Sequence, residues 1–288
     1  MQHIVLLGFG AIGRDIAQQL APEIAAGEIT LTAVVRSLAG HAGRDDLGAA
    51  VRTADDAQWD QLIGTADVVV ECASVAAAVD LAPAVISAGA DLVLTSVGAL
   101  ADDSARASLL GGPGRLWVTN GAIGGFDVLG AAADAHGLDS ISIRTAKLAG
   151  SLVQPWMSES QARRLTQLRR GDDPITVFQG DPISAIRKFP ANVNVSAALA
   201  WATRGLPQSG ATSDLQLMAS SLQRVQVCLL ADPDAELSRH EVLAHGPAGR
   251  FEFTFESAPS PNNPKTSGLT ALSVVRSLRA ALQAPPLR

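Results

Sequence analysis

The stretch HIVLLGFGAIGRDIAQQL, residues 3–20, joins an apolar strand pattern to an amphipathic helix pattern through a glycine-rich turn. The turn has the spacing GxGxxG: its first glycine permits a tight bend, its second lets the backbone approach a pyrophosphate, and its third lets helix and strand pack closely. N–H groups at the helix start also favour phosphate. We therefore expect a dinucleotide site here, the alternative being an α/β turn without a ligand. The expected contacts are Gly8, Gly10, Ala11, Ile12 and Gly13.

The first part of the chain alternates short runs of Val, Ile and Leu with longer Ala-rich amphipathic segments. This alternation is typical of βαβ units around a buried parallel sheet. The sequence therefore predicts a Rossmann-type, doubly wound parallel sheet. Its expected strands are residues 3–8, 28–36, 66–74, 91–96 and 115–120.

After residue 120 the pattern changes to a glycine-rich joint, a helix to about His136, and then strands with period-two alternation. Such strands predict a second, α+β domain with a mainly antiparallel sheet. We expect a dinucleotide-binding domain over residues 1–120, completed by a C-terminal helix within 264–288, and a substrate, catalytic and oligomerisation domain over 121–263. The strands of the second domain are expected at residues 140–147, 174–180, 224–230, 239–245 and 250–257.

The composition indicates a globular protein with a small-molecule partner. The chain has 288 residues, of which 47% are hydrophobic, and a formal net charge of −6, which argues against a nucleic-acid or anionic-membrane surface. No apolar run approaches the ~20 residues that a membrane span needs. Cys72 and Cys228 sit in apolar runs without CxxC spacing, so we expect core packing in a reducing cytosol and no metal site. The expected location is cytoplasmic.

Five short motifs follow one another along nearly the whole chain. They are Ser96-Val-Gly-Ala-Leu100, Gly121-Ala-Ile-Gly-Gly125 with Asp127, Phe189-Pro-Ala-Asn-Val-Asn-Val195, Ala231-Asp-Pro233 leading to His240, and Asn263-Pro-Lys-Thr-Ser267. In this order they resemble the L-aspartate dehydrogenase family. The resemblance implies NAD(P)-dependent oxidative deamination of L-aspartate to iminosuccinate, which becomes oxaloacetate and ammonia, and the reverse reductive amination. It also implies a homodimer or higher homo-oligomer.

Two segments, residues 148–173 and 203–222, depart from the family pattern. They leave open a dehydrogenase or imine reductase that acts on another small amino acid. A catalytically silent NAD(P)-sensing protein is the alternative from another functional class; it would keep the glycine loop and lose the acid–base residue.

The resemblance assigns the catalytic role to His240. An imidazole with a pKa near 6.5 suits proton transfer, and amine oxidation needs a base to deprotonate the substrate ammonium and to activate water on the imine. From its pattern alone, a histidine that opens a strand is more often a surface residue. His245 points to the opposite face of the strand by period two, so the two histidines do not form a metal site.

Further contacts are expected from the resemblance and from strand ends. The resemblance matches Ala122 and Asn194 to cofactor contacts, although Asn194 also suits a helix N-cap. Ser74, Ser96 and Gly98 follow expected strands at the carboxyl edge, where open α/β sheets bind ligands; ordinary turns are the alternative. A substrate with two carboxylates needs cations or polar donors. The candidates are Lys147, Arg187, Lys188, Asn263 and Lys265.

The second expected strand ends on Val34-Val-Arg-Ser37, and no Asp or Glu follows until Asp45. NAD binders place a carboxylate near this strand end, where it accepts hydrogen bonds from the ribose hydroxyls. An arginine suits a 2′-phosphate, and the missing carboxylate removes a repulsion against NADP. We expect NADP to be accepted at least as well as NAD, with Arg36 and Ser37 as the discriminating contacts. The alternative is a surface arginine that contacts nothing.

Overall fold

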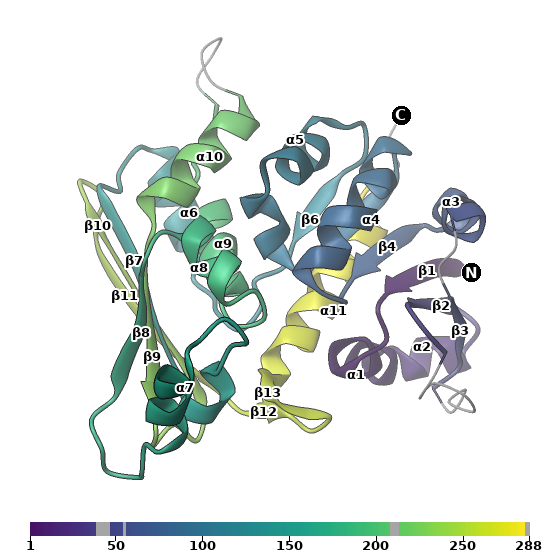
Figure 1. The fold of residues 1–288 in the computed structure, drawn as a ribbon. Coiled ribbons are helices and arrows are strands. Elements are labelled where there is room, and N and C mark those ends of the chain that lie inside the picture. Colours follow the sequence, from purple (N-terminus) through teal and green to yellow (C-terminus); the bar gives the residue numbers. More distant parts are fainter. Residues whose placement is uncertain (39–46, 54–55, 208–212, 286–288) are drawn as a thin grey trace. The chain divides into compact units, whose positions relative to one another are not determined.

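The computed structural model describes the whole chain except residues 39–46, 54–55, 208–212 and 286–288. It divides into two compact units (Figure 1). Unit 1 comprises Met1–Gly121 with Ser260–Arg288, and unit 2 comprises Ala122–Pro259. The C-terminal part of unit 1 therefore begins at Ser260, earlier than the expected residue 264.

Unit 1 is built on a six-stranded sheet in the order β3-β2-β1-β4-β5-β6, in which every neighbouring pair is parallel. The chain winds outward in both directions from β1 and β4, so the topological switch point of a doubly wound fold lies between these two strands. This confirms the expected Rossmann-type sheet. The strands are β1 (Gln2–Leu7), β2 (Ile29–Val35), β3 (Ala49–Thr53), β4 (Val68–Glu71), β5 (Asp91–Leu94) and β6 (Leu116–Val118).

The edge strand β3 was not among the five expected strands. Its sequence, AAVRT, is short and contains no apolar run, and its side chains beyond Ala49 are half-buried or exposed. Pairing with β2 therefore defines this strand more than local pattern does.

Helices cover the sheet of unit 1. Helices α1 (Ala11–Gln19) and α11 (Gly268–Gln283) bury apolar side chains against β1, β2 and β4 in one cluster. Ser267 caps α11 by accepting a hydrogen bond from the Leu269 N–H, and α11 belongs to unit 1. The other elements are α2 (Ala21–Ala25), α3 (Asp56–Thr65), α4 (Val75–Ser87), η1 (Val97–Ala101), α5 (Asp103–Gly111), β12 (Pro259–Ser260) and β13 (Asn263–Ser267).

Unit 2 contains a five-stranded sheet in the order β11-β10-β7-β9-β8. Only the pair β7 and β9 is parallel, so the sheet is mainly antiparallel as predicted. Its strands are β7 (Ser140–Leu148), β8 (Ile175–Gly180), β9 (Gln226–Asp232), β10 (Ser238–Gly246) and β11 (Gly249–Ser257).

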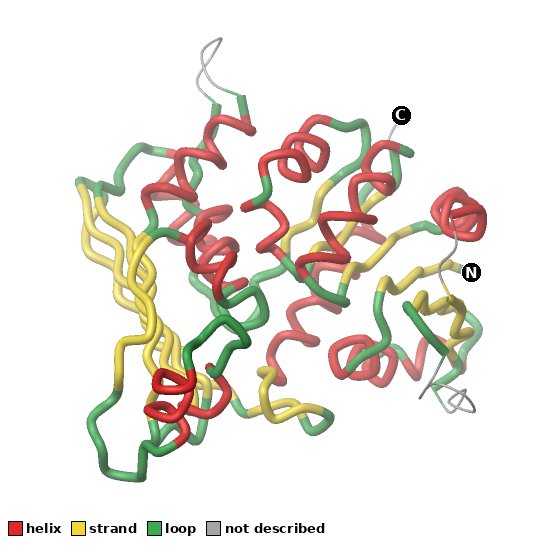
Figure 2. Tube along the Cα trace, viewed as in Figure 1, coloured by secondary structure: helices red, strands yellow, loops and turns green. Residues whose placement is uncertain are grey.

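Helices lie on one side of the unit 2 sheet, whereas the alternate residues of β10 and β11 on its other face are mostly exposed (Figures 1 and 2). The covered face therefore provides the interior of this unit. The helical elements are α6 (Phe126–Asp134), η2 (Ala149–Leu152), α7 (Glu159–Thr166), α8 (Pro182–Lys188), α9 (Asn194–Ala202) and α10 (Asp214–Arg224).

Both cysteines are free. Cys72 is buried, its thiol donates to the Gly8 carbonyl oxygen at 3.2 Å, and burial raises its pKa well above the usual value. Core packing was the expected role, and a protonated thiol suits it. In the part of the chain that the structure describes, no helix is long and apolar enough to cross a membrane.

Candidate active site

The glycine loop between β1 and α1 has two glycines that exclude a side chain. Gly8 has φ +106°, and a Cβ there would lie 2.8 Å from the Ala73 backbone. A Cβ on Gly13 would lie 2.6 Å from the Gly8 carbonyl oxygen. The first and third glycines therefore serve the tight turn and the close helix–strand packing that the sequence predicted.

Gly10 differs, because a Cβ there would meet no described atom within 4 Å. It is the N-cap residue of α1, and no side chain of the described residues caps this helix. The first N–H groups of α1, which begin at Ala11 and Ile12, therefore have no side-chain cap from the described residues, and the positive end of the helix dipole lies at the same place. This geometry fits a dinucleotide pyrophosphate.

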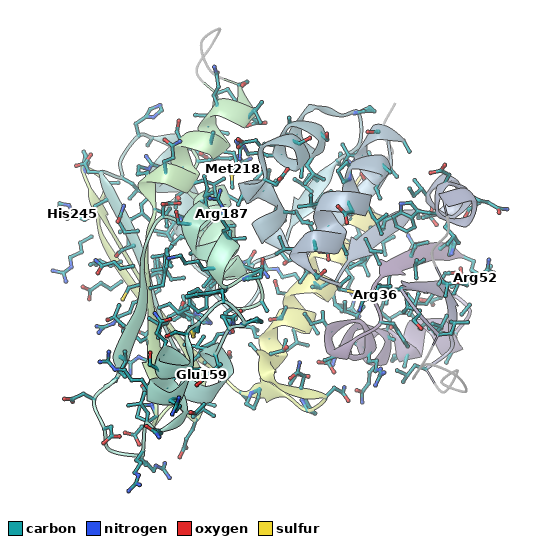
Figure 3. All side chains as sticks on the ribbon, viewed as in Figure 1. Arg36, Arg52, Glu159, Arg187, Met218 and His245 are labelled. Atoms are coloured by element: carbon teal, nitrogen blue, oxygen red, sulfur yellow. The ribbon has the colours of Figure 1, made fainter. Side chains whose placement is uncertain are left out.

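At the other end of the expected cofactor site, Arg36 and Ser37 follow β2 directly and are exposed. The neighbouring strand adds a second arginine, Arg52, which lies beside Val34 in the parallel register and is also exposed (Figure 3). The sequence pattern did not single out Arg52, because β3 was not among the expected strands. Asp45 lies outside the described residues.

The carboxyl ends of β4 and β5 are joined by Glu71, a residue that sequence analysis also missed. Its carboxylate is fully buried and accepts hydrogen bonds from the N–H groups of Ala73 (2.9 Å), Ser74 (3.2 Å) and Ser96 (2.7 Å) and from the Ser96 hydroxyl (3.0 Å). Burial raises the pKa of Glu71, and these hydrogen bonds oppose the rise. The signal in the sequence was an acidic residue at the end of the apolar strand VVVE.

The expected cofactor contacts on these two loops have clear local roles. Ser74 is the N-cap of α4 and accepts from the Ala77 N–H. Ser96 is buried and donates twice to Glu71, and Gly98 is buried within η1. The loops are therefore held in place by the protein itself, at the edge where doubly wound sheets bind ligands.

In unit 2, His240 lies inside the covered face of the sheet rather than on the surface. Its side chain is 1% exposed, and Nδ1 forms a 2.9 Å hydrogen bond with the Thr145 hydroxyl on β7. Burial and the charge of Lys147 lower the pKa of His240 to about 3, so the usual value near 6.5 does not hold at this position. His245 is exposed on the other face, as period two predicted.

Lys147 lies two residues beyond Thr145 on β7 and so shares its face. Burial lowers its pKa to about 8. Among the described residues, the Lys147 ammonium has no ion-pair partner. The face therefore brings together a neutral imidazole and an amine that changes charge just above neutral pH, which is the kind of perturbed pair found at functional sites.

The glycine-rich joint packs beside this cluster. Gly125, the N-cap of α6, has φ +74°, and a Cβ there would lie 2.9 Å from the Phe253 ring; one on Gly124 would lie 3.3 Å from the Phe255 ring. Phe255 pairs with His240 across β10 and β11. These two glycines therefore allow the start of α6 to approach the strand next to His240. Ala122 is buried.

Two further expected residues, Asn194 and Lys188, each make a contact within unit 2. Asn194 is the first residue of α9, where its Nδ2 donates to the Pro190 carbonyl at 3.4 Å; the N-cap is Val193, so the N-cap alternative is wrong. Lys188 is held by aromatic rings, with Nζ 5.7 Å from the centroids of Trp156 and Phe178.

The other three residues expected to bind substrate lie on α8 and β13. Arg187 is exposed on α8 (Figure 3), and Asn263 is half-buried in β13. The backbone of Lys265 belongs to β13, and its side chain lies outside the described residues.

The chain is similar over its whole length to known dehydrogenases. An L-aspartate dehydrogenase of Methanosarcina acetivorans is 31% identical over 289 aligned residues, covering 98% of this chain and 97% of the relative. One from Ruegeria pomeroyi is 34% identical, covering 96% and 91%. The NAD-binding domain of homoserine dehydrogenase matches residues 8–111.

Solved structures share the fold. An aspartate dehydrogenase from Thermotoga maritima superposes with a TM-score of 0.69 at 22% identity, covering 99% of this chain and 97% of the other. A hyperthermophilic archaeal homoserine dehydrogenase in complex with NADPH gives a TM-score of 0.54 at 13% identity, covering 100% and 99%. The C-terminal domain of aspartate dehydrogenase matches residues 127–281, more than half of the chain. The chain therefore belongs to the L-aspartate dehydrogenase family.

Proposed function

We propose that the protein oxidatively deaminates L-aspartate with NAD(P), giving iminosuccinate and then oxaloacetate and ammonia, and that it also runs the reverse reductive amination. The observation that carries the proposal is the cluster of buried Thr145 and His240 with half-buried Lys147 in a chain of this family. A catalytically silent cofactor sensor would have no need to bury a histidine and a lysine together, because both groups lose hydration there.

When bound, the cofactor supplies the hydride chemistry, while the protein binds the substrate and moves protons. With Nδ1–H donating to the Thr145 hydroxyl, His240 keeps the lone pair of Nε2 for a proton. A pKa of about 3 keeps the ring neutral at neutral pH but makes it a weak base, so the proposed role requires that substrate binding raise this pKa. Nε2 takes a proton from the substrate ammonium and releases it to solvent; it then takes a proton from the water that adds to the imine carbon and returns that proton to the nitrogen that leaves as ammonia.

Lys147 is the proposed partner of a substrate carboxylate. An anion beside its ammonium would favour the charged form and raise its pKa from about 8. The same anion would offset the repulsion that Lys147 exerts on His240, so substrate binding makes the imidazole a stronger base. Asn263 and Lys265 remain proposed contacts for the substrate, and Ala122 and Asn194 for the cofactor.

The test is a panel of amino acids assayed with NAD and NADP in parallel. We expect L-aspartate to have the highest kcat/KM, and oxaloacetate with ammonia to be reduced. A higher kcat/KM for L-glutamate or L-alanine would show that the substrate assignment is wrong while the fold stands. Cofactor binding without turnover of any amino acid would favour the sensor.

For the cofactor, we propose that NADP is accepted at least as well as NAD. The support is the pair of exposed arginines, Arg36 and Arg52, at the ends of adjacent strands, with Ser37 beside them. Two guanidinium groups suit a 2′-phosphate, because each offers paired donors with a fixed positive charge.

We further propose a cytoplasmic homo-oligomer, at least a dimer. The outer face of the unit 2 sheet includes the exposed apolar side chains Leu148 and Leu243, which suit contact with a second copy. The two free cysteines suit a reducing compartment. Light scattering of the purified protein would give its mass, and cell fractionation its location.

A further inference from the structure

Glu71 is an unusual residue for the floor of a cofactor site. It is fully buried at the carboxyl end of β4, and among the described residues no lysine, arginine or histidine pairs with it. A buried carboxylate without a cation carries a large desolvation cost. The fold keeps this charge where an apolar residue would continue the strand pattern, so a functional reason is required.

The donors around Glu71 match its ionised form. Three of the four hydrogen bonds come from backbone N–H groups, which can only donate, and the fourth comes from the Ser96 hydroxyl. An ionised carboxylate offers about four acceptor positions; here Oε1 accepts three of the hydrogen bonds and Oε2 accepts one. A protonated carboxyl would place an O–H among donors. The three backbone donors therefore favour the ionised form and act against the rise in pKa that burial causes.

Glu71 also lies next to the glycine loop. Ala73, which donates to it, is the residue that a Cβ on Gly8 would touch, and the Cys72 thiol donates to the Gly8 carbonyl. In a doubly wound sheet each half takes one mononucleotide. Arg36 and Arg52 mark the β2 and β3 side as the adenosine end. The half that begins with β4, where Glu71 lies, is therefore left for the nicotinamide.

We propose that Glu71 is a positioning residue that fixes the loops after β4 and β5, and that its charge stabilises the oxidised cofactor relative to the reduced one. The nicotinamide ring is a cation when oxidised and neutral when reduced, so a fixed anion acts on one form only. Hydride transfer from the reduced ring leaves that cation behind, and Glu71 therefore assists the reductive direction. The inference rests on the proposed NAD(P) function.

The test is Glu71→Gln, with dissociation constants measured for the oxidised and the reduced form of the same cofactor by tryptophan fluorescence and calorimetry. Loss of the charge should raise the ratio Kd(oxidised)/Kd(reduced) by about three- to tenfold, the order expected for one charge acting through protein interior. A purely structural role would weaken both forms equally, and an unchanged ratio would overturn the electrostatic part.

Two variants separate charge from position. Glu71→Asp keeps the charge and shortens the reach to the four donors, so it should weaken both cofactor forms and leave the ratio near that of the wild type. Asp91→Asn removes another buried carboxylate from the opposite end of the neighbouring strand, where it pairs with Arg115 at 2.7 Å. It should leave the ratio unchanged.

The wild type provides a check that does not depend on a folded Glu71→Gln variant. We expect it to bind the oxidised cofactor at least as tightly as the reduced one, and tenfold tighter binding of the reduced form would overturn the inference. Failure to bind either form would instead remove the proposed function, so the two failures are distinguishable.

Discussion

Each unit buries ionisable groups in its candidate site, but the two units surround these groups differently. In unit 1 the Glu71 carboxylate receives four hydrogen bonds from two loops. In unit 2 the His240 side chain forms a hydrogen bond with the Thr145 hydroxyl, and Lys147 lowers the pKa of His240 further by repulsion. Hydrogen-bond donors therefore surround the Glu71 carboxylate, whereas burial disfavours the charged forms of His240 and Lys147.

The difference follows from what each site has to do. A group that is saturated with hydrogen bonds resists changes in its protonation and position, which suits the fixed floor of a cofactor site. A histidine and a lysine with few partners have pKa values far from their usual range, and a ligand can change them strongly. This difference supports the proposed division of roles, in which unit 1 binds the cofactor and unit 2 carries out proton transfer.

The largest expected effect belongs to unit 2. His240→Ala should lower kcat by roughly 10² to 10⁴, the usual range for loss of a general acid–base, while the cofactor Kd stays nearly unchanged. Steady-state kinetics and fluorescence titration measure the two quantities. His245→Ala, on the exposed face of the same strand, is the matched control. An unchanged kcat with a weakened cofactor Kd would break the division of roles between the units.

The next effect concerns the adenosine end of unit 1. Arg36→Ala should weaken NADP by roughly 1.5 to 3 kcal/mol, the range for a hydrogen bond to a charged group, and leave NAD within about tenfold. The comparison is kcat/KM for both cofactors in wild type and variant. Arg52→Ala should act in the same direction. Equal losses for both cofactors, or a wild type that does not use NADP, would show that Arg36 does not read the 2′ position.

The glycine loop allows packing and binding to be separated within unit 1. Gly13→Ala places a Cβ 2.6 Å from the Gly8 carbonyl and should cost about 1 to 3 kcal/mol of folding stability, with or without cofactor. Gly10→Ala meets open space, so its melting temperature should be nearly that of the wild type while cofactor binding weakens roughly tenfold. Thermal melts with and without NADP distinguish them, and the reverse pattern would contradict the assigned roles.

The smallest expected effect is a change of stability with pH. In the unfolded chain Lys147 keeps its proton up to about pH 10.5, and in the folded chain it loses the proton at about pH 8. Between these values the unfolded state binds more protons, so stability from this group rises with pH, and below 8 the folded state carries the cost of a buried ammonium.

Lys147→Met should therefore raise Tm at pH 7, and the wild type should gain on the variant as the pH rises from about 8 to 10.5. Melting curves across this range give the difference, and Lys188→Met, an exposed lysine, is the control. A constant difference between wild type and Lys147→Met would mean that Lys147 does not titrate as the buried environment requires.

Acid sensitivity follows from His240 by the same reasoning. In the unfolded chain His240 takes up a proton near pH 6.5, and in the folded chain only near pH 3. Folding stability is therefore lost as the pH falls between these values. A His240→Gln variant should lose less stability over that range, as measured by urea unfolding at several pH values. An identical loss would assign the acid sensitivity to other groups.

Local patterns were sufficient for most of the architecture. The apolar runs before Gly8 and after residue 140 have the right period and length for strands, and every expected strand is present. The GxGxxG turn predicted the loop geometry because the steric demands of Gly8 and Gly13 arise within a few residues of the turn and the strand beside it. Such features depend on backbone propensity and periodicity, which a sequence carries directly.

By itself the sequence determined the two fold patterns and the glycine loop, and its resemblance to a known family pointed to His240 as the candidate base. Only the tertiary structure decided that β3 is a strand, that Glu71 is saturated with hydrogen bonds, and that His240 and Lys147 share one buried face. The physical reason is that burial and cross-strand partners come from residues far apart in the chain. The pKa of a side chain depends on that environment, and the residue type alone does not fix it.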